Sequence, residues 1–419
     1  RKSMKICIHR GAKEIGGSCV ELESQGQRLL LDLGLPLDAE NNDPKYLPEI
    51  KGLDGKDPSF LGILISHPHV DHFGLLSHIS ADIPVGMGAA ARRILKAAAP
   101  FMPGKWPAPD KGWDYESEVP FEVGPFTITP YLVDHSAYDA YALLIEADGK
   151  RLFYSGDFRA HGRKGKLFDR MIKSPPEHID VMLLEGTSLG RLGDDKPFPS
   201  ETDIERKFEK AFNETAGLAM VHCSSQNVDR VVSVMKASKR TGRKLVIDLY
   251  TAVVLEATGN KHIPQSDWRE IALFVPESQS WKIKRNAWFD LLKQHSRNRI
   301  FREKIHESPE RYTLLFRPLY QGDLTQGECL EGASYIYSQW EGYWDRGEFD
   351  GVKRWLEQHG IDKRSNHTSG HASPLDLKRL VKALKPGTVV PIHTFKPEHY
   401  EKMYPNVDVH GDGEWWSVD

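Results

Sequence analysis

The sequence has few cysteines, no long apolar run and almost no net charge. Its four cysteines are spread over 419 residues and form no CxxC pair, so neither a disulfide framework nor a thiolate zinc site is indicated. No apolar run reaches the roughly 18 to 20 residues of a membrane-spanning helix, and the segment RKSMKICIHRG lacks the apolar region of a secretory signal. We therefore expect a soluble cytoplasmic protein with no membrane partner.

The formal charge of −3 gives no overall attraction to a polyanion, so nucleic-acid binding would require a local basic surface. The segment from Trp281 to Lys304 is a candidate, because it holds eight basic and two acidic residues, a local charge of +6. Four aromatic residues are interleaved with these charges, namely Trp281, Trp288, Phe289 and Phe301. Such a mixture can neutralise phosphates and stack bases. It is equally consistent with a solvated helix face above a few core aromatics.

The pattern of expected strands and helices changes near residue 200. From residue 4 to about 190, short apolar strands predominate, with a hairpin turn at Asp148-Gly149, and this order predicts a sandwich of sheets with helices outside. From about residue 200, helix and strand alternate, which predicts a parallel sheet. After residue 365 we expect one more helix, with Ser373 as its N-cap, and then the strand TVVPIH.

A cluster of histidines directly follows the apolar segment LGILIS. Three of the 18 histidines of the chain fall in the run HPHVDH at residues 67–72. Imidazole together with carboxylate favours zinc or another first-row divalent metal over calcium or magnesium. Alternate residues His67 and His69 project to one side of an extended segment, while Asp71 and His72, at the start of the next helix, can turn toward a second metal.

Two more apolar strands end in candidate ligands, His135 and Asp157. A carboxylate such as Asp157 can bridge two metals, and two metals about 3.5 to 4 Å apart can activate a water and stabilise the oxygens of an in-line displacement at phosphorus. A single histidine after a strand is more often a surface or core residue than a ligand. The joint occurrence of these residues favours a two-metal hydrolase.

The order of these residues, with Asp32 in LLLDLG, resembles the motifs of the metallo-β-lactamase superfamily. Glu185 in LLLEGTS, His371 in TSGHASPLDL and His393 in VVPIHTF resemble the three additional motifs of the β-CASP nucleases. This group contains ribonuclease J and the RNA 3′-end-processing endonucleases. The run HCSSQNVDRVVSVMKASKRTGRKLVI resembles a helix and strand of the inserted β-CASP domain.

The resemblance implies an α/β fold, an αββα metallo-β-lactamase sandwich with an inserted α/β β-CASP domain that has a parallel sheet. We expect the metallo-β-lactamase domain to comprise residues 1–195 and 365–419, and the β-CASP domain to comprise residues 196–364. The resemblance is faint between residues 255 and 360.

The resemblance also implies roles for the motif residues. Two zinc ions, or manganese in their place, would be held by His67, His69, Asp71, His72, His135, Asp157 and His393, with Asp157 as the bridge. Asp32 would orient the ligating histidines from behind them. His371, positioned by Glu185, would donate to the phosphate or the departing oxygen, so that Asp71, His371 and Glu185 are the expected catalytic residues. The alternative for the pair Glu185 and His371 is an ordinary buried hydrogen bond.

A histidine at the last motif, here His393, is typical of the RNA-acting branch, whereas DNA-repair members usually carry an apolar residue there. Candidate nucleic-acid contacts lie at the starts of expected helices, where hydroxyls and backbone amides can meet phosphates: Ser224, Ser225, Asn227 and Ser373. Plain N-capping is the alternative for them. We expect a nuclease that cleaves single-stranded RNA, as an endonuclease, a 5′-exonuclease or both. The alternatives are a single-stranded DNA nuclease and a non-catalytic nucleic-acid-binding relative.

Two features depart from the ribonuclease J pattern. Thr394 and Phe395 follow the last motif histidine, where that family usually has Gly-Glu, so recognition of a phosphate or a terminus can differ. The chain ends at residue 419, which leaves no room for the extra C-terminal domain that helps ribonuclease J oligomerise. We therefore expect a monomer or a homodimer.

Overall fold

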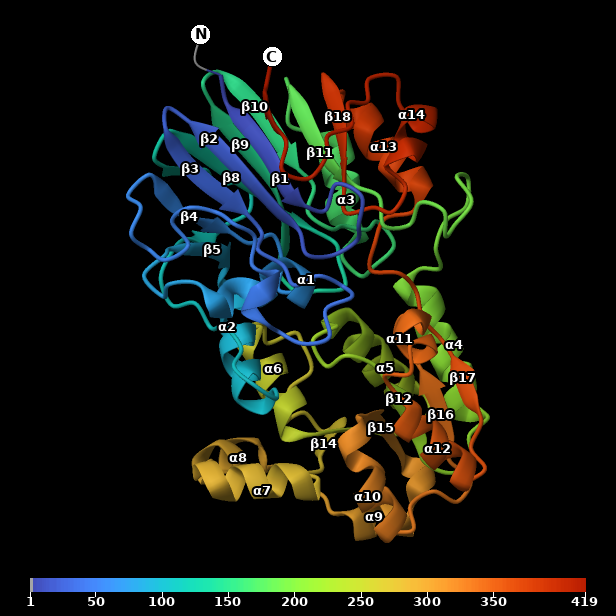
Figure 1. The fold of residues 1–419 in the computed structure, drawn as a ribbon. Helices are drawn as coiled ribbons and strands as arrows, with labels where there is room; N and C mark the ends of the chain where they lie inside the picture. The colour runs from blue at the N-terminus through green and yellow to red at the C-terminus, as the bar shows by residue number, and fades with distance from the viewer. Residues whose placement is uncertain (1–2) are drawn as a thin grey trace. The chain divides into compact units, whose positions relative to one another are not determined.

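The computed structural model describes residues 3–419 and forms two compact units (Figure 1). The first unit comprises Arg1–Phe198 and Gly370–Asp419, and the second unit comprises Pro199–Ser369. The domain boundaries predicted from the sequence lie after residues 195 and 364. Within residues 3–419, no helix is long and apolar enough to cross a membrane.

The first unit contains two sheets, each with antiparallel and parallel pairs. The first sheet consists, in spatial order, of β19 (Trp415–Ser417), β1 (Lys5–Arg10), β2 (Cys19–Ser24), β3 (Gln27–Leu31), β4 (Phe60–Leu64), β5 (Val85–Gly88) and β6 (Asp114–Tyr115). The second sheet consists of β18 (Thr388–Ile392), β11 (Val181–Glu185), β10 (Lys150–Tyr154), β9 (Ala140–Ala147), β8 (Phe126–Val133) and β7 (Phe121–Val123). The expected hairpin joins β9 to β10, where Asp148 and Gly149 both have positive φ, 52° and 73°.

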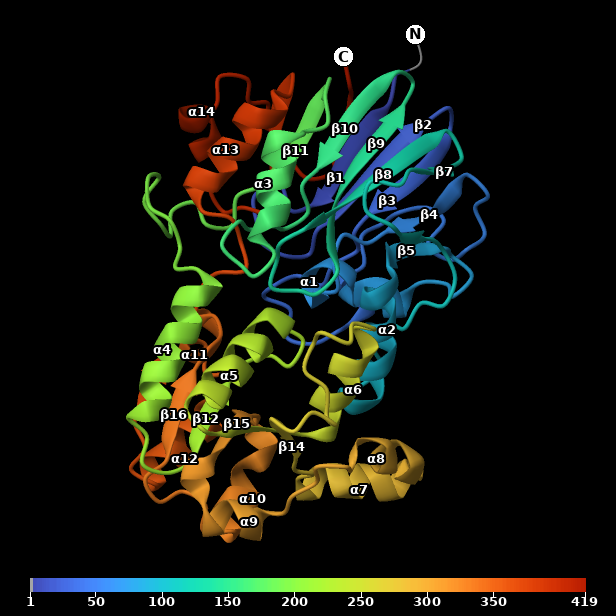
Figure 2. The same cartoon turned by 180° about the vertical axis from the view of Figure 1, so that it is seen from behind.

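Alternation of apolar side chains along the strands builds the layers of the first unit. Leu29 and Leu143 belong to the core between the two sheets, whereas their neighbours Leu30 and Leu144 face outward to helices. Successive side chains of a strand point to opposite faces, so a strand with apolar residues throughout can be buried on both. The helices of this unit are α1 (Val70–Phe73), α2 (Ala89–Ala98), α3 (Gly165–Lys173), α13 (Pro374–Leu384) and α14 (Tyr400–Met403). They cover the outer faces of the sheets (Figure 2).

The second unit is built on a six-stranded sheet in which every pair is parallel. In spatial order its strands are β14 (Ile271–Leu273), β13 (Lys244–Ile247), β15 (Tyr312–Phe316), β12 (Ala219–His222), β16 (Ser334–Tyr337) and β17 (Lys363–Ser365). Its helices are α4 (Glu201–Asn213), α5 (Val228–Arg240), α6 (Leu249–Ala257), α7 (Glu277–Asn286), α8 (Phe289–His295), α9 (Arg302–Glu307), α10 (Gln321–Gln326), α11 (Glu341–Asp345) and α12 (Asp350–Gln358). The predicted α/β class with a parallel sheet is confirmed.

A buried ion pair joins two helices of the second unit. The guanidinium of Arg230 on α5 donates to Glu201 at the start of α4, with 2.8 Å between Nη2 and Oε1, and both side chains are almost fully buried. Ser233 donates to the other carboxylate oxygen of Glu201, and Arg230 Nη1 donates to Ser338. Removing one member of such a pair leaves a buried charge without its counter-charge, which is far more costly than losing a surface pair.

We expect Glu201→Ala to lower the free energy of unfolding of the second unit by about 3 to 5 kcal/mol. The matched control is Glu209→Ala on the same helix, where the pair with Arg240 is partly exposed, so that its loss should cost about 1 kcal/mol or less. Chemical denaturation of the full chain, followed by tryptophan fluorescence, measures both changes. Equal losses in the two variants would contradict the assignment.

Candidate metal centre

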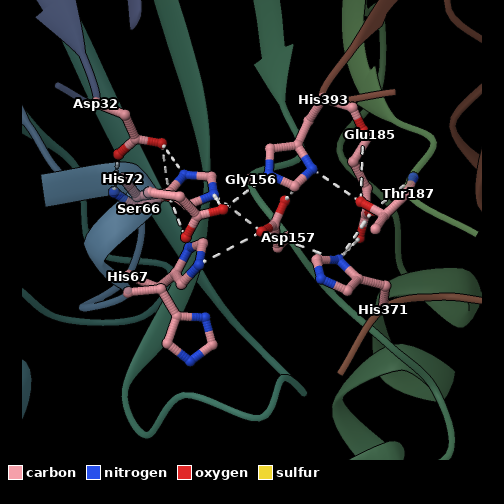
Figure 3. Close-up of polar contacts among 12 residues, drawn as sticks. Asp32, Ser66, His67, His72, Gly156, Asp157, Glu185, Thr187, His371 and His393 are labelled. Carbon is pink, nitrogen blue, oxygen red and sulfur yellow. Dashed lines mark hydrogen bonds and ion pairs between the residues drawn. The ribbon is translucent and has the colours of Figure 1, made fainter. Parts of the chain in front are cut away.

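The ends of five strands deliver the side chains of the candidate site to one place in the first unit. Figure 3 shows six of these side chains gathered together: His67, His72, Asp157, Glu185, His371 and His393. β4 leads into the histidine run at residues 67–72, and β8 leads into His135. In the second sheet, β10 leads into Asp157, β11 ends at Glu185 and β18 leads into His393. All five strands present their carboxyl ends, so residues more than 300 positions apart in sequence lie within hydrogen-bonding distance, as His393 and Asp71 do at 3.2 Å.

The candidate ligands form two groups that could each hold an ion. Within each group, the donor atoms lie within 4.8 Å of one another. The first group is His67, His69 and His135, and the second is Asp71, His72, Asp157 and His393. Asp157 joins them, because its Oδ2 lies 2.9 Å from His72 Nε2 and 3.5 Å from His67 Nε2. The structure therefore brings together all seven residues that were predicted from the sequence to be metal ligands.

The histidine tautomers fit metal binding. Nδ1 of His72 lies 2.8 Å from the carboxylate of Asp32, and Nδ1 of His135 lies against the carbonyl of Gly370. A nitrogen beside a carboxylate or carbonyl oxygen must be the N–H donor, so Nε2 keeps its lone pair and faces the cluster. His67 follows the same pattern, because the hydroxyl of Ser66 donates to Asp32 and can only accept from His67 Nδ1, at 2.9 Å.

Several buried polar atoms at the cluster lack a hydrogen-bond partner within the described part of the chain. Among these atoms are His67 Nε2 and Asp157 Oδ1. A buried polar atom without a partner costs free energy, and a divalent cation among these lone pairs would remove that cost. The donor set of imidazoles and carboxylates is also the one that first-row divalent metals prefer. The residues therefore fit a divalent metal site.

The protonation states of most candidate ligands favour metal binding, with His72 as the exception. Burial lowers the pKa of His72, but Asp157, Asp71 and Asp32 outweigh burial and raise this pKa well above the usual range, so a cation would have to displace a proton from this ring. Burial and the neighbouring histidines hold the pKa of His67 and of His135 well below the usual range, and burial is the main reason that the pKa of His69 falls to about 4. Burial opposes the charge on Asp71 and Asp157, but nearby histidines outweigh it and keep both carboxyl pKa values below normal. Neutral imidazoles and ionised carboxylates are the forms that bind metals.

Asp32 and Thr187 orient two of the histidines. Asp32 is fully buried and accepts from His72, from the hydroxyls of Ser66 and Tyr154, and from the backbone amide of Ser66. Thr187 Oγ1 lies 2.8 Å from Nδ1 of His393, which leaves Nε2 of His393 to face Asp71. Asp32 and His393 both have positive φ, 60° and 53°, a conformation that non-glycine residues adopt at some cost.

The sequence did not identify Ser66, Tyr154 or Thr187 as part of the site. Thr187 lies in the LLLEGTS segment, two residues after Glu185, so its proximity to that motif was an available signal. Ser66 directly precedes His67 in the same way. Tyr154 ends β10 and reaches Asp32 from the opposite sheet, and no sequence pattern indicates that contact.

His371 lies beside Glu185 at the edge of the cluster. Its Nδ1 is 3.1 Å from Glu185 Oε2 and 3.9 Å from Asp157 Oδ2. Burial lowers the pKa of His371, but Glu185 and Asp157 outweigh this and raise the pKa to about 9. The side chains of His371 and Asp71 keep 21% and 24% of their exposure, whereas His67, His72, Asp157 and His393 are closed off. Solvent therefore reaches the cluster at His371 and Asp71, and also at His69, which is partly exposed.

The four candidate nucleic-acid contacts occupy different places. Ser373 is fully buried and caps α13 by accepting from the amide of Asp376, which is the capping alternative. Ser224, Ser225 and Asn227 belong to the second unit. Ser224 is exposed, Ser225 is buried against Thr251, and Asn227 caps α5.

Comparison with known proteins defines the family. Residues 39–271 match the model of the family described as "Beta-lactamase superfamily domain", which is more than half of the chain. The chain belongs to the metallo-β-lactamase superfamily. Ribonuclease J of Mycoplasma pneumoniae is 25% identical over 260 residues, which is 58% of this chain and 43% of that protein. Ribonuclease J of Helicobacter pylori strain 26695 is 24% identical over 270 residues, 59% of this chain and 36% of that protein.

The chain thus spans less than half the length of these curated relatives. A crystal structure of a protein of unknown function from Enterococcus faecalis V583 superposes with a TM-score of 0.81 at 21% identity, over 99% of this chain and 100% of that one. That match shows a shared fold across both units. The sequence-based recognition of the metallo-β-lactamase superfamily is confirmed, and the similarity to ribonuclease J agrees with the resemblance found in the sequence.

We expect Thr187→Val to lower the affinity for divalent metal by about 10- to 100-fold, because such supporting hydrogen bonds typically contribute that much. The variant keeps the size of the side chain but removes the oxygen that holds His393 Nδ1. Competition titration with a chromophoric chelator measures the change. Thr388→Val, on the strand that leads to His393, is the control and should bind metal like the unmodified protein. Unchanged affinity in Thr187→Val would refute the orienting role.

Proposed function

We propose that the protein is a zinc-dependent nuclease that hydrolyses phosphodiester bonds of single-stranded RNA. One observation carries the proposal, namely that Asp157 joins two groups of buried donors beside a histidine held by Glu185. The ribonuclease J relatives support RNA as the substrate class. The proposal has three further parts. The second unit is a β-CASP domain, the protein acts in the cytoplasm, and manganese can replace zinc in the site.

In the proposed site, His67, His69 and His135 would hold one ion, and Asp71, His72, Asp157 and His393 would hold the other. Two divalent ions in such a site supply Lewis acidity that activates water and stabilises charge on phosphate oxygens. Asp32 and Thr187 fix the orientation of the ligating histidines, and Asp71 also lies on the open side of the site, where substrate enters.

His371 supplies the proton in this proposal. The carboxylate of Glu185 accepts a hydrogen bond from Nδ1 of His371, so Nε2 is the nitrogen that can face a substrate. With a pKa of about 9, the imidazole is protonated at neutral pH and can donate from Nε2 to a phosphate oxygen or to the departing oxygen. Of the four candidates for phosphate contacts, Ser224 is exposed and Asn227 is partly exposed, whereas Ser225 and Ser373 are buried, so the proposal retains Ser224 and Asn227.

The first test is metal-dependent cleavage of labelled RNA. The zinc-loaded protein should cleave single-stranded RNA, and a chelator or His69→Ala should lower the rate at least about 100-fold, because either change dismantles the site that activates water. The exposed His262 offers the control His262→Ala, which should cleave normally. Activity that survives both chelation and His69→Ala would refute the proposal. Faster cleavage of a matched DNA oligomer would favour the DNA alternative, and RNA binding without cleavage would favour a non-catalytic relative.

The second test separates proton donation from metal binding at His371. The donors of Asp157, Glu185, His371 and His393 also lie within 4.8 Å of one another, so His371 could in principle be a ligand. We expect His371→Gln to lower the cleavage rate about 100- to 10,000-fold while elemental analysis finds unchanged metal content. The control is His399→Gln, a partly exposed histidine of the same unit. A loss of bound metal in His371→Gln would assign it as a ligand instead.

A further inference from the structure

We propose that residues 281–304, named here the basic arm, form a docking surface for single-stranded RNA. The basic arm contains most of α7, all of α8 and the start of α9, and in both views α7 and α8 lie side by side and project from the parallel sheet of the second unit (Figures 1 and 2). This inference rests on the proposed function for its ligand class, but not on any residue of the metal centre.

The basic arm exposes aromatic rings to solvent. The exposed fractions are 65% for Trp281, 57% for Phe289 and 57% for Phe301. Of the eight large apolar side chains that are exposed among residues 3–419, three therefore lie in this one short segment. Scattered single exposures are ordinary, whereas a local concentration of apolar side chains indicates a binding surface. These rings do not fill the core, in contrast to the alternative of a solvated face above core aromatics.

Each exposed ring lies next to a cation. Lys284 Nζ is 5.5 Å from the centroid of the Trp281 ring, and the Arg299 guanidinium is 4.9 Å from that of Phe301. Lys293 follows Phe289 by four residues on α8, which places the two side chains on the same face of the helix. Rings that stack bases beside cations that neutralise phosphates are the elements of single-strand binding.

The inner faces of the two helices are firmly attached. Gln279 of α7 is buried and bonds through its amide to Asp248 and to the amide of Leu249, at the start of α6. His295 of α8 is buried, and its Nδ1 lies 2.7 Å from Ser266 Oγ. The rings and cations are therefore presented by an ordered support, which lowers the entropy that binding would cost.

The distribution of charge favours a polyanion with accessible bases. The basic arm carries +6 in a chain of net charge −3, so the rest of the chain carries −9 and would repel RNA. A duplex keeps its bases stacked inside, where the rings could not reach them. An acidic protein surface would satisfy the cations but would give the three rings no flat partners. A single strand satisfies both.

Two sets of substitutions in the full chain separate the charge contribution from the stacking contribution. The variant Lys284→Gln/Arg285→Gln/Lys293→Gln removes three positive charges from the basic arm. Affinity for a fluorescent RNA of about 20 nucleotides, measured by anisotropy with metal chelated to prevent cleavage, should fall at least about 10-fold at low salt. The slope of log K against log salt should decrease by about 2, since each phosphate contact to a single strand contributes about 0.7.

Trp281→Ala/Phe289→Ala should also weaken binding, by about five-fold or more for each lost stack, but should leave the salt slope unchanged. The control is Lys207→Gln/Lys236→Gln/Lys261→Gln, which removes the same charge from exposed lysines elsewhere in the second unit and should bind almost normally. Unchanged RNA affinity in both basic-arm variants would overturn the proposal and leave this surface to a protein partner. The proposal would also be overturned if the control variant bound RNA as weakly as the basic-arm charge variant, since RNA binding would then depend on overall charge alone.

Catalysis distinguishes this inference from the proposed function. The zinc-loaded basic-arm variants should cleave an RNA of about three nucleotides, shorter than the roughly 4 to 16 nucleotides of a single-strand site, at the rate of the unmodified protein. If the unmodified protein binds RNA through the basic arm but cleaves none, the nuclease proposal fails and the docking surface stands. If the unmodified protein cleaves RNA and the basic-arm variants bind RNA normally, the docking-surface proposal fails and the nuclease proposal stands.

Discussion

The carboxylate of Asp157 lies among four imidazoles in a part of the first unit that water barely reaches. Its oxygens are within 4 Å of ring nitrogens of His67, His72, His371 and His393. A buried carboxylate is strongly disfavoured unless charge or hydrogen bonds compensate it. The arrangement around Asp157 therefore constrains everything nearby: the strands that carry these histidines must end together, and each ring must turn the correct nitrogen inward.

Oxygen atoms on the outer side of the rings fix which nitrogen of each histidine faces the cluster. Asp32, Ser66, Thr187 and the carbonyl of Gly370 each face an Nδ1 atom, and the lone pairs of the Nε2 atoms consequently converge. The same constraint explains why His393 and Asp32 tolerate left-handed backbone conformations. Strain of this kind persists where the surrounding structure fixes the residue, and here both sheets of the first unit do so.

The two units contribute differently to the proposed activity. The first unit concentrates lone pairs and carboxylates, so it holds cations but offers little to attract a polyanion. The second unit carries the basic arm, where +6 of charge lies beside exposed rings.

The sequence by itself determined the local part of the site and the class of fold. The run at residues 67–72 predicts a metal site because its ligands are neighbours in the chain, and the change from short strands to alternating helix and strand predicts a sandwich followed by a parallel sheet. His135, Asp157, Glu185, His371 and His393 could be nominated from their motifs. Only the tertiary structure decided that they meet, which tautomer each ring adopts, and that Tyr154 and Thr187 support them. These contacts join strand ends from both sheets, and a linear pattern carries no record of distances that arise only when the sheets pack.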